Sequence, residues 1–105
     1  MNISYEDNVF EELLDISSYL FDIQEELAQR FLDSCDATFR FLATNPNIGT
    51  PNKFSESRLS SVRMVQVKDF RKYLVFYFAT DKEIRILHVI HSAMDYNRIF
   101  DEELG

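Results

Sequence analysis

The sequence predicts an α+β fold in which an N-terminal helical hairpin packs on a small antiparallel β-sheet. Two stretches before residue 45 have helical periodicity, and the runs after residue 61 are rich in β-branched and aromatic residues. Short polar turns separate those later runs, as in a meander of neighbouring antiparallel strands. The chain has 105 residues, a length typical of one domain, so we expect residues 1–105 to form a single unit.

The first helix is expected from about Asp7 to Phe21. Its apolar residues recur every three or four positions, which is typical of an amphipathic helix facing a core. The central stripe is Val9, Leu13, Ile16 and Leu20, and it is widened by Phe10, Leu14 and Phe21. The acidic residues of this region are expected on the solvated side of the hairpin: Glu11, Glu12, Asp15, Asp22, Glu25 and Glu26.

A second helix is expected to follow directly and to reach Thr44. Asp22 and Glu25 have the spacing of a capping box, which predicts its start. Pro46 predicts its end, because the residue before a proline is driven out of the helical region. The core-facing residues would be Ala28, Phe31, Cys35, Phe39 and Leu42.

Three strands are expected in the second half: Val62–Lys68, Tyr73–Ala79 and Ile84–His91. Residues 2–5 are a candidate short first strand, and residues 45–61 have the composition of a loop. The middle run is apolar throughout, so we expect it to be central and covered on both faces. Strict alternation in the third run puts Ile84, Ile86 and Ile90 on one face, and Leu87 and Val89 on the other.

The predicted sheet therefore needs more cover than the hairpin supplies. Two helices cover one face, and only a short C-terminal helix or tail, Tyr96–Leu104, remains for the other. Uncovered apolar surface usually marks a binding site. We expect a partner to lay an amphipathic segment in that groove.

The charge distribution and the cysteine content indicate which partners and which cellular compartment to expect. The net charge is −7, but residues 1–45 carry ten carboxylates against two arginines, whereas residues 53–85 carry eight basic residues against four acidic ones. This distribution argues against nucleic-acid coating and against sequence-specific DNA binding by this chain alone, and favours a locally basic surface that meets an acidic protein. No apolar run is long enough to span a membrane, no signal peptide is evident, and the single cysteine suits a reducing compartment, so a cytoplasmic protein is expected.

No motif for catalysis, a metal or a cofactor is visible. His88 and His91 lie three apart on a strand, so they point to opposite faces and cannot share a metal. His91, followed by Ser92 and Asp95, is a candidate general base, although a hydrogen-bonded structural role is favoured. Cys35 lies on an apolar helical stripe, which indicates core packing. We therefore predict no catalytic residue, no metal ligand and no cofactor.

Basic residues are better candidates for function. Arg63 on the first long strand, Arg71 and Lys72 in the turn, and Arg85 on the last strand are candidates to converge on one sheet surface. There they would contact phosphates or carboxylates of a partner. Alternatively, they are solvated charges that keep the sheet from aggregating.

The order of these elements, with the residues on them, resembles the RelE/ParE toxin superfamily, and most closely its ParE, or plasmid-stabilisation, branch. The resemblance covers roughly residues 3 to 100. It rests on the helical hairpin, the Asn45–Gly49 loop (Asn-Pro-x-Ile-Gly), Val62-Arg63, Phe70–Tyr77, Ile86–His91 and the His91-x-Ala93-x-Asp95 turn.

The resemblance implies the toxin of a type II toxin–antitoxin system, bound and neutralised by a cognate ParD-like antitoxin in a hetero-oligomer. In the ParE branch the implied target is DNA gyrase, which the toxin blocks by binding and not as an enzyme. The implied target-binding residues are Arg63, Arg71, Lys72 and His91, and the implied antitoxin groove contains Arg85, Leu87 and Val89. Two alternatives stay open: a RelE-like, ribosome-dependent mRNA endonuclease, and a non-toxic interaction protein on the toxin scaffold.

Two positions disfavour RNA cleavage. In the alignment with the RNA-cleaving branch, catalytic arginines fall at Leu74 and near Met94, and neither side chain stabilises a phosphorane. The sequence also departs from the ParE pattern, which commonly has arginine where His88 stands and Gly-Ala-Arg-Asp where Ser92–Asp95 stands. Those two missing charges bear on potency and on the target.

Overall fold

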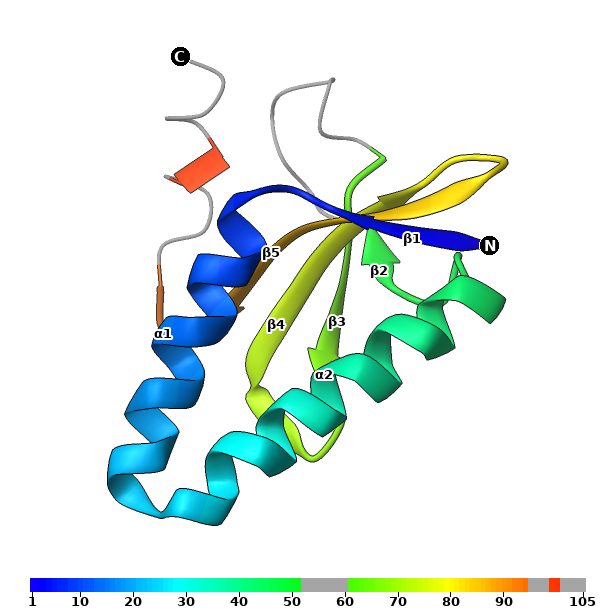
Figure 1. The fold of residues 1–105 in the computed structure, drawn as a ribbon. Helices are drawn as coiled ribbons and strands as arrows, with labels where there is room; N and C mark the ends of the chain where they lie inside the picture. Colours follow the sequence, from blue (N-terminus) through cyan, green and yellow to red (C-terminus); the bar gives the residue numbers. More distant parts are fainter. Residues whose placement is uncertain (52–60, 95–98, 101–105) are drawn as a thin grey trace.

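Two helices form a V that lies against one face of a mixed β-sheet (Figure 1). The computed structural model describes residues 1–51, 61–94 and 99–100. Its elements are β1 (Asn2–Tyr5), α1 (Asn8–Ile23), α2 (Glu25–Thr44), β2 (Thr50–Pro51), β3 (Arg63–Val67), β4 (Phe70–Ala79) and β5 (Glu83–His91). The predicted helical hairpin followed by strands is confirmed. Most of the predicted C-terminal helix or tail lies outside the described residues.

The sheet has five strands in the order β1-β5-β4-β3-β2. The predicted antiparallel meander is confirmed for β3, β4 and β5, but β1 runs parallel to β5, so the sheet is mixed and not purely antiparallel. β1 reaches β5 only after the chain has passed through both helices and three strands, a connection long enough to permit parallel pairing. β2 pairs with only the first two residues of β3.

The turn between the helices differs from the predicted capping box. α1 continues through Asp22 to Ile23, and Gln24 is the residue that separates the helices, with extended backbone angles (φ −159°, ψ 124°). No side chain caps the start of α2. The capping-box prediction is therefore wrong, because Asp22 lies inside α1. α2 ends at Thr44 as expected, ahead of Pro46.

The main core lies between the hairpin and the sheet. Every residue of β4 from Tyr73 to Tyr77 is buried, as expected for a central strand with both faces covered. The core residues fully buried on the hairpin side of the sheet come from both helices and from β3–β5: Val9, Phe31, Cys35, Leu42, Val67, Val75, Tyr77, Ile84, Ile86 and Val89.

A smaller cluster fills the second face of the sheet. Its buried members are Val62, Leu74, Phe76, Ile90 and Phe100. The Phe100 ring packs edge-on against the ring of Phe76, with centroids 5.4 Å apart. These side chains are buried, whereas Met64, Leu87 and Ile99 beside them are only partly buried, so among the described residues the expected uncovered apolar surface is limited to part of this face.

The exposed apolar surface is found on α1 instead. Phe10, Leu14 and Phe21, which the sequence predicted to widen the core stripe, are 62%, 65% and 51% exposed. Along a helix they lie about 100° away from the stripe that faces the sheet, because each residue turns the helix by that angle. This prediction is wrong: α1 has two apolar faces, and only one contributes to the core.

A β-bulge in β5 reverses the expected alternation of its side chains. Tyr77 pairs with Ile86 and Phe76 pairs with His88, so Leu87 is an extra residue with no partner position on β4. Val89 therefore joins Ile84 on the helix-covered face, while Leu87 and Ile90 pack with the second cluster. The strict alternation predicted from the sequence fails at this point.

Candidate functional site

An open, mostly apolar groove of about 660 Å³ runs between α1 and the ends of β4 and β5. Two basic side chains line it, Lys72 at the start of β4 and His91 at the end of β5. Its walls are formed by Glu12, Asp15, Ile16, Tyr19, Leu20 and Ile23 from α1, and by Tyr73, Val89, Ile90, Met94 and Ile99. Of the four predicted target-binding residues, the fold brings these two together.

The backbone joins the segments that carry these two residues. The N–H of Ser92 donates to the carbonyl of Lys72 at 2.7 Å, and Tyr73 pairs with His91 across the ladder. Arg71 is the preceding, exposed residue and lines a neighbouring surface depression together with Lys72. Arg71, Lys72 and His91 are thus held near one another at one end of the sheet.

His91 is fixed by two contacts. Its Nδ1 accepts a hydrogen bond from the backbone N–H of Ala93 at 2.9 Å, and its ring packs edge-on against Tyr73 at 5.1 Å. A neutral ring whose Nδ1 accepts carries its proton on Nε2, so the other ring nitrogen is a donor. This agrees with the favoured prediction of a hydrogen-bonded histidine over a general base.

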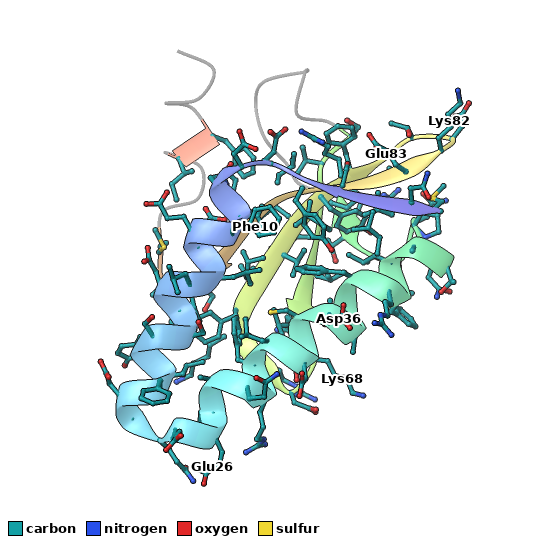
Figure 2. All side chains as sticks on the ribbon, in the orientation of Figure 1. Phe10, Glu26, Asp36, Lys68, Lys82 and Glu83 are labelled. Atoms are coloured by element: carbon teal, nitrogen blue, oxygen red, sulfur yellow. The ribbon has the colours of Figure 1, made fainter. Side chains whose placement is uncertain are left out.

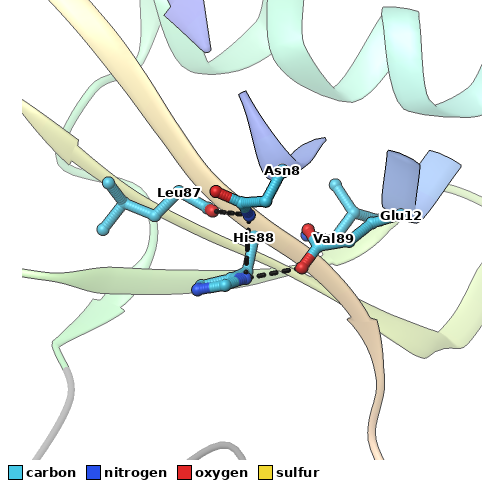
Figure 3. Close-up of polar contacts among 5 residues, drawn as sticks. All are labelled: Asn8, Glu12, Leu87, His88 and Val89. Carbon is cyan, nitrogen blue, oxygen red and sulfur yellow. Dashed lines mark hydrogen bonds and ion pairs between the residues drawn. The ribbon is translucent and has the colours of Figure 1, made fainter. Parts of the chain in front are cut away.

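The outer edge of β5 is sealed by side chains of α1 (Figure 3). Asn8 donates from Nδ2 to the carbonyl of Leu87 at 2.9 Å, and Glu12 accepts from the N–H of Val89 at 2.9 Å. The second oxygen of Glu12 lies 2.6 Å from Nδ1 of the buried His88. The Asn8 amide nitrogen also lies 3.2 Å from this ring nitrogen, but the contact with Glu12 is the shorter one, and because a carboxylate only accepts, it favours a proton on Nδ1 of His88.

Arg63 lies away from the groove. It is the first residue of β3 and pairs with Tyr77, whereas the last residue of β3 pairs with the start of β4, close to Lys72. Its guanidinium donates to the carbonyls of Gly49 at 2.7 Å and Asn47 at 3.2 Å. The buried hydroxyl of Tyr77 donates to the carbonyl of Pro46 and accepts from the N–H of Gly49, both at 2.9 Å. Arg63 therefore fixes the loop of residues 46–49, and the predicted convergence of the basic residues on one surface is wrong.

The three residues predicted for the antitoxin groove do not share one environment. Arg85 and Leu87 are half-buried, and the Nε of Arg85 lies 3.3 Å from a carboxylate oxygen of Glu6. Val89 is fully buried on the helix-covered face, so in this structure its side chain is not accessible to a partner. The bulge at Leu87 is the physical reason for this difference.

The described part of the chain offers neither a cluster of metal ligands nor a reactive thiol. Within it, no three metal-binding side chains gather in one place. Burial in the core raises the pKa of the Cys35 thiol from 9.0 to about 12, so at neutral pH it is neither a nucleophile nor a metal ligand. The prediction that Cys35 packs in the core is confirmed.

Sequence reasoning missed the roles of Asn8, which it did not single out, and of Glu12, which it placed on the solvated side of the hairpin. A usable signal was their spacing. Asn8, Glu12 and Ile16 recur every four residues, which places both polar side chains on the row that continues into the core stripe. A polar residue in such a row is expected to reach a buried partner.

The helical hairpin on a mixed five-stranded sheet defines an α+β protein. The family model for the ParE toxin of the type II toxin–antitoxin system, parDE, matches residues 3–96, so this chain belongs to that family. A solved structure described as the chromosomal ParDE TA system from P. aeruginosa has the same fold, with a TM-score of 0.71. It is 17% identical, over 87% of this chain and 95% of that one. Comparison with curated proteins finds no match.

Within the described residues, no helix has the length and apolar character needed to cross a bilayer. The family that it belongs to is that of the toxins of type II toxin–antitoxin systems.

Proposed function

We propose that this toxin binds DNA gyrase in the cytoplasm, blocks it without acting as an enzyme, and is neutralised by a cognate ParD-like antitoxin. The observation that carries the proposal is the pairing of Lys72 and His91 at an open groove beside α1. The exposed cation of Lys72 and the half-buried ring of His91, beside apolar side chains, suit a protein surface that presents carboxylates. Arg71 extends the same basic surface.

Binding is favoured over RNA cleavage by the chemistry of two positions, Leu74 and Met94. Leu74, where the RNA-cleaving branch has an arginine, is an apolar side chain buried in the second cluster. Met94 carries no charge, and Nδ1 of His91 is engaged by the backbone N–H of Ala93. A phosphorane needs cationic or donor groups aimed at its oxygens, and the side chains of Leu74 and Met94 are neither.

The antitoxin is proposed to contact the half-exposed residues Arg85 and Leu87 on β5. Because a partner that binds only the folded state adds stability by mass action, the toxin should melt at a higher temperature in the complex. An unchanged melting temperature at saturating antitoxin would contradict this contact.

Growth after induced expression tests the proposal in cells. Wild type is expected to arrest growth, and co-expressed antitoxin is expected to restore it. The double variant Lys72→Ala/His91→Ala should lose toxicity, whereas Lys82→Ala, at the β4–β5 turn far from the groove (Figure 2), should retain it. Thermal melts of all variants must show that they fold, so that a loss of toxicity reports on the surface.

The remaining outcomes separate the alternatives. A groove variant that is folded and still toxic removes Lys72 and His91 from the site. Cleavage of ribosome-bound mRNA by wild type but not by His91→Ala would favour the endonuclease. Normal growth at expression levels that match an active toxin would favour a non-toxic interaction protein.

A further inference from the structure

The outward face of the helical hairpin carries an apolar row that the fold does not use. Phe10, Leu14 and Phe21 of α1 are all more than half exposed. Their spacing of four and seven residues puts them on one side of the helix. Phe10 and Phe21 are eleven positions apart, or about 16 Å at the helical rise.

The row continues into a shallow groove between the two helices. Its walls include Phe10 and Leu13 from α1 and Leu32 and Asp36 from α2, and its floor includes Cys35 (Figure 2 labels Phe10 and Asp36). The Phe10 ring is anchored by packing against Tyr5, with ring centroids 5.6 Å apart. An apolar row beside a groove between helices is the geometry that accepts a third helix.

Carboxylates border the row on both sides. Glu11 and Asp22 are exposed on α1, about 100° around the helix from the row. Across the groove Asp36 is exposed but forms an ion pair with Arg40 at 3.0 Å, so the charge that attracts a basic partner comes mainly from the Glu11–Asp22 side. Over residues 8–44 the hairpin carries eight carboxylates and only two arginines.

We infer that this face docks a basic amphipathic helix of a partner protein, about three turns long, with leucine-like residues on the row and lysine or arginine toward the carboxylates. Charge selects this occupant. A second copy of the chain would bring one acidic face against another, and an anionic membrane surface would be repelled. The inference concerns a surface separate from the Lys72–His91 groove and does not depend on gyrase.

The test uses a fluorescent 18-residue peptide of leucine and lysine, with leucines spaced for one helical face, titrated into the full chain. Wild type should bind it, with an affinity that falls as salt is added. Phe10→Ser/Leu14→Ser should weaken binding at least tenfold, and Glu11→Gln/Asp22→Asn should weaken it at least threefold. A peptide of the same composition in scrambled order and a leucine–glutamate version should bind at least tenfold more weakly to wild type.

Matched controls lie elsewhere on the surface. Phe41→Ser removes an aromatic of α2 that is 52% exposed and lines a different groove, beside β3. Asp81→Asn removes a carboxylate from the β4–β5 turn. Both should bind the peptide within twofold of wild type.

Several outcomes would overturn the inference. One is equal binding of the scrambled peptide, and another is unchanged binding by the folded Phe10→Ser/Leu14→Ser variant. A third is a dimer of the wild-type chain, measured by sedimentation, that the Leu14→Ser variant does not form. Co-flotation with phosphatidylcholine–phosphatidylglycerol vesicles, lost in Leu14→Ser, would assign the face to a membrane. None of these readouts uses growth or gyrase, so the toxin proposal stands or falls separately.

Discussion

The Glu12 carboxylate joins α1 to β5 by accepting the Nδ1 proton of His88 at 2.6 Å and the N–H of Val89 at 2.9 Å. β1 pairs with β5 only as far as Ile86, and Glu6 closes that ladder by donating its N–H to the Ile86 carbonyl. Beyond Ile86, side chains of α1 hydrogen-bond the strand edge: Asn8 donates to the Leu87 carbonyl and Glu12 accepts from the Val89 N–H. The helix thereby stabilises the irregular part of β5 that leads to His91.

Removing the Glu12 carboxylate should destabilise the fold. In Glu12→Ala the buried His88 ring loses its hydrogen bond to Glu12 and the Val89 N–H loses its acceptor, so the free energy of unfolding should fall by about 1–3 kcal/mol. Urea unfolding followed by circular dichroism measures this change. Glu11→Ala, one residue away and exposed, should stay within about 0.5 kcal/mol of wild type. Equal effects of the two substitutions would contradict the role assigned to Glu12.

A side chain at position 49 should disturb the loop that precedes β2. A Cβ built on Gly49 would lie 2.6 Å from the Tyr77 hydroxyl and 3.0 Å from Cβ of Arg63, which is too close for both. Because Tyr77 is fully buried and bonded to this loop, Gly49→Ala should lower the melting temperature by several degrees. Tyr77→Phe should also lower it, since the N–H of Gly49 loses its acceptor. Wild-type melting of Gly49→Ala would show that the loop yields freely.

Arg63 and Lys72 should separate in their effects on stability. Arg63→Ala deletes two hydrogen bonds to loop carbonyls and should cost about 1–2 kcal/mol of unfolding free energy. Lys72→Ala removes an exposed side chain and should stay within about 0.5 kcal/mol. Urea unfolding of the two single variants checks this. If Arg63→Ala proved stable and non-toxic, Arg63 would return to the target-binding surface.

The Cys35 thiol should be inert in the folded protein. Burial raises its pKa from 9.0 to about 12, so the thiolate needed for alkylation is absent at pH 8. Iodoacetamide should therefore react quickly only after unfolding in urea. Because the folded state holds the raised pKa, the stabilisation is complete below pH 9 and is lost as the pH rises toward 12. Rapid labelling of the native chain at pH 8 would contradict the burial of Cys35.

The hairpin and the three-strand meander were predictable from the sequence because their periods are regular. Hydrophobic spacing marked Val9 and Leu20 on α1, and an unbroken apolar run marked the central strand β4. The parallel pairing of β1 was not predictable from four residues, since register and direction depend on distant partners.

Three other predictions from the sequence were wrong for local physical reasons. The bulge at Leu87 shifts the register by one residue, and nothing in an alternating apolar run signals such an insertion. Phe10 and Leu14 fit a wide apolar stripe by composition, but the sheet contacts only one side of α1. Arg63 resembled a free basic residue because its acceptors are backbone carbonyls, which sequence patterns do not reveal.

The most direct measurement is a plasmid supercoiling assay with purified gyrase, ATP and this chain, with and without antitoxin. If the chain is a gyrase-directed toxin, supercoiling should stop and linear DNA should accumulate, antitoxin should reverse both, and Lys72→Ala/His91→Ala should have little effect on the enzyme. Unaffected supercoiling at saturating wild-type protein, across homologous gyrases, would contradict the proposed target.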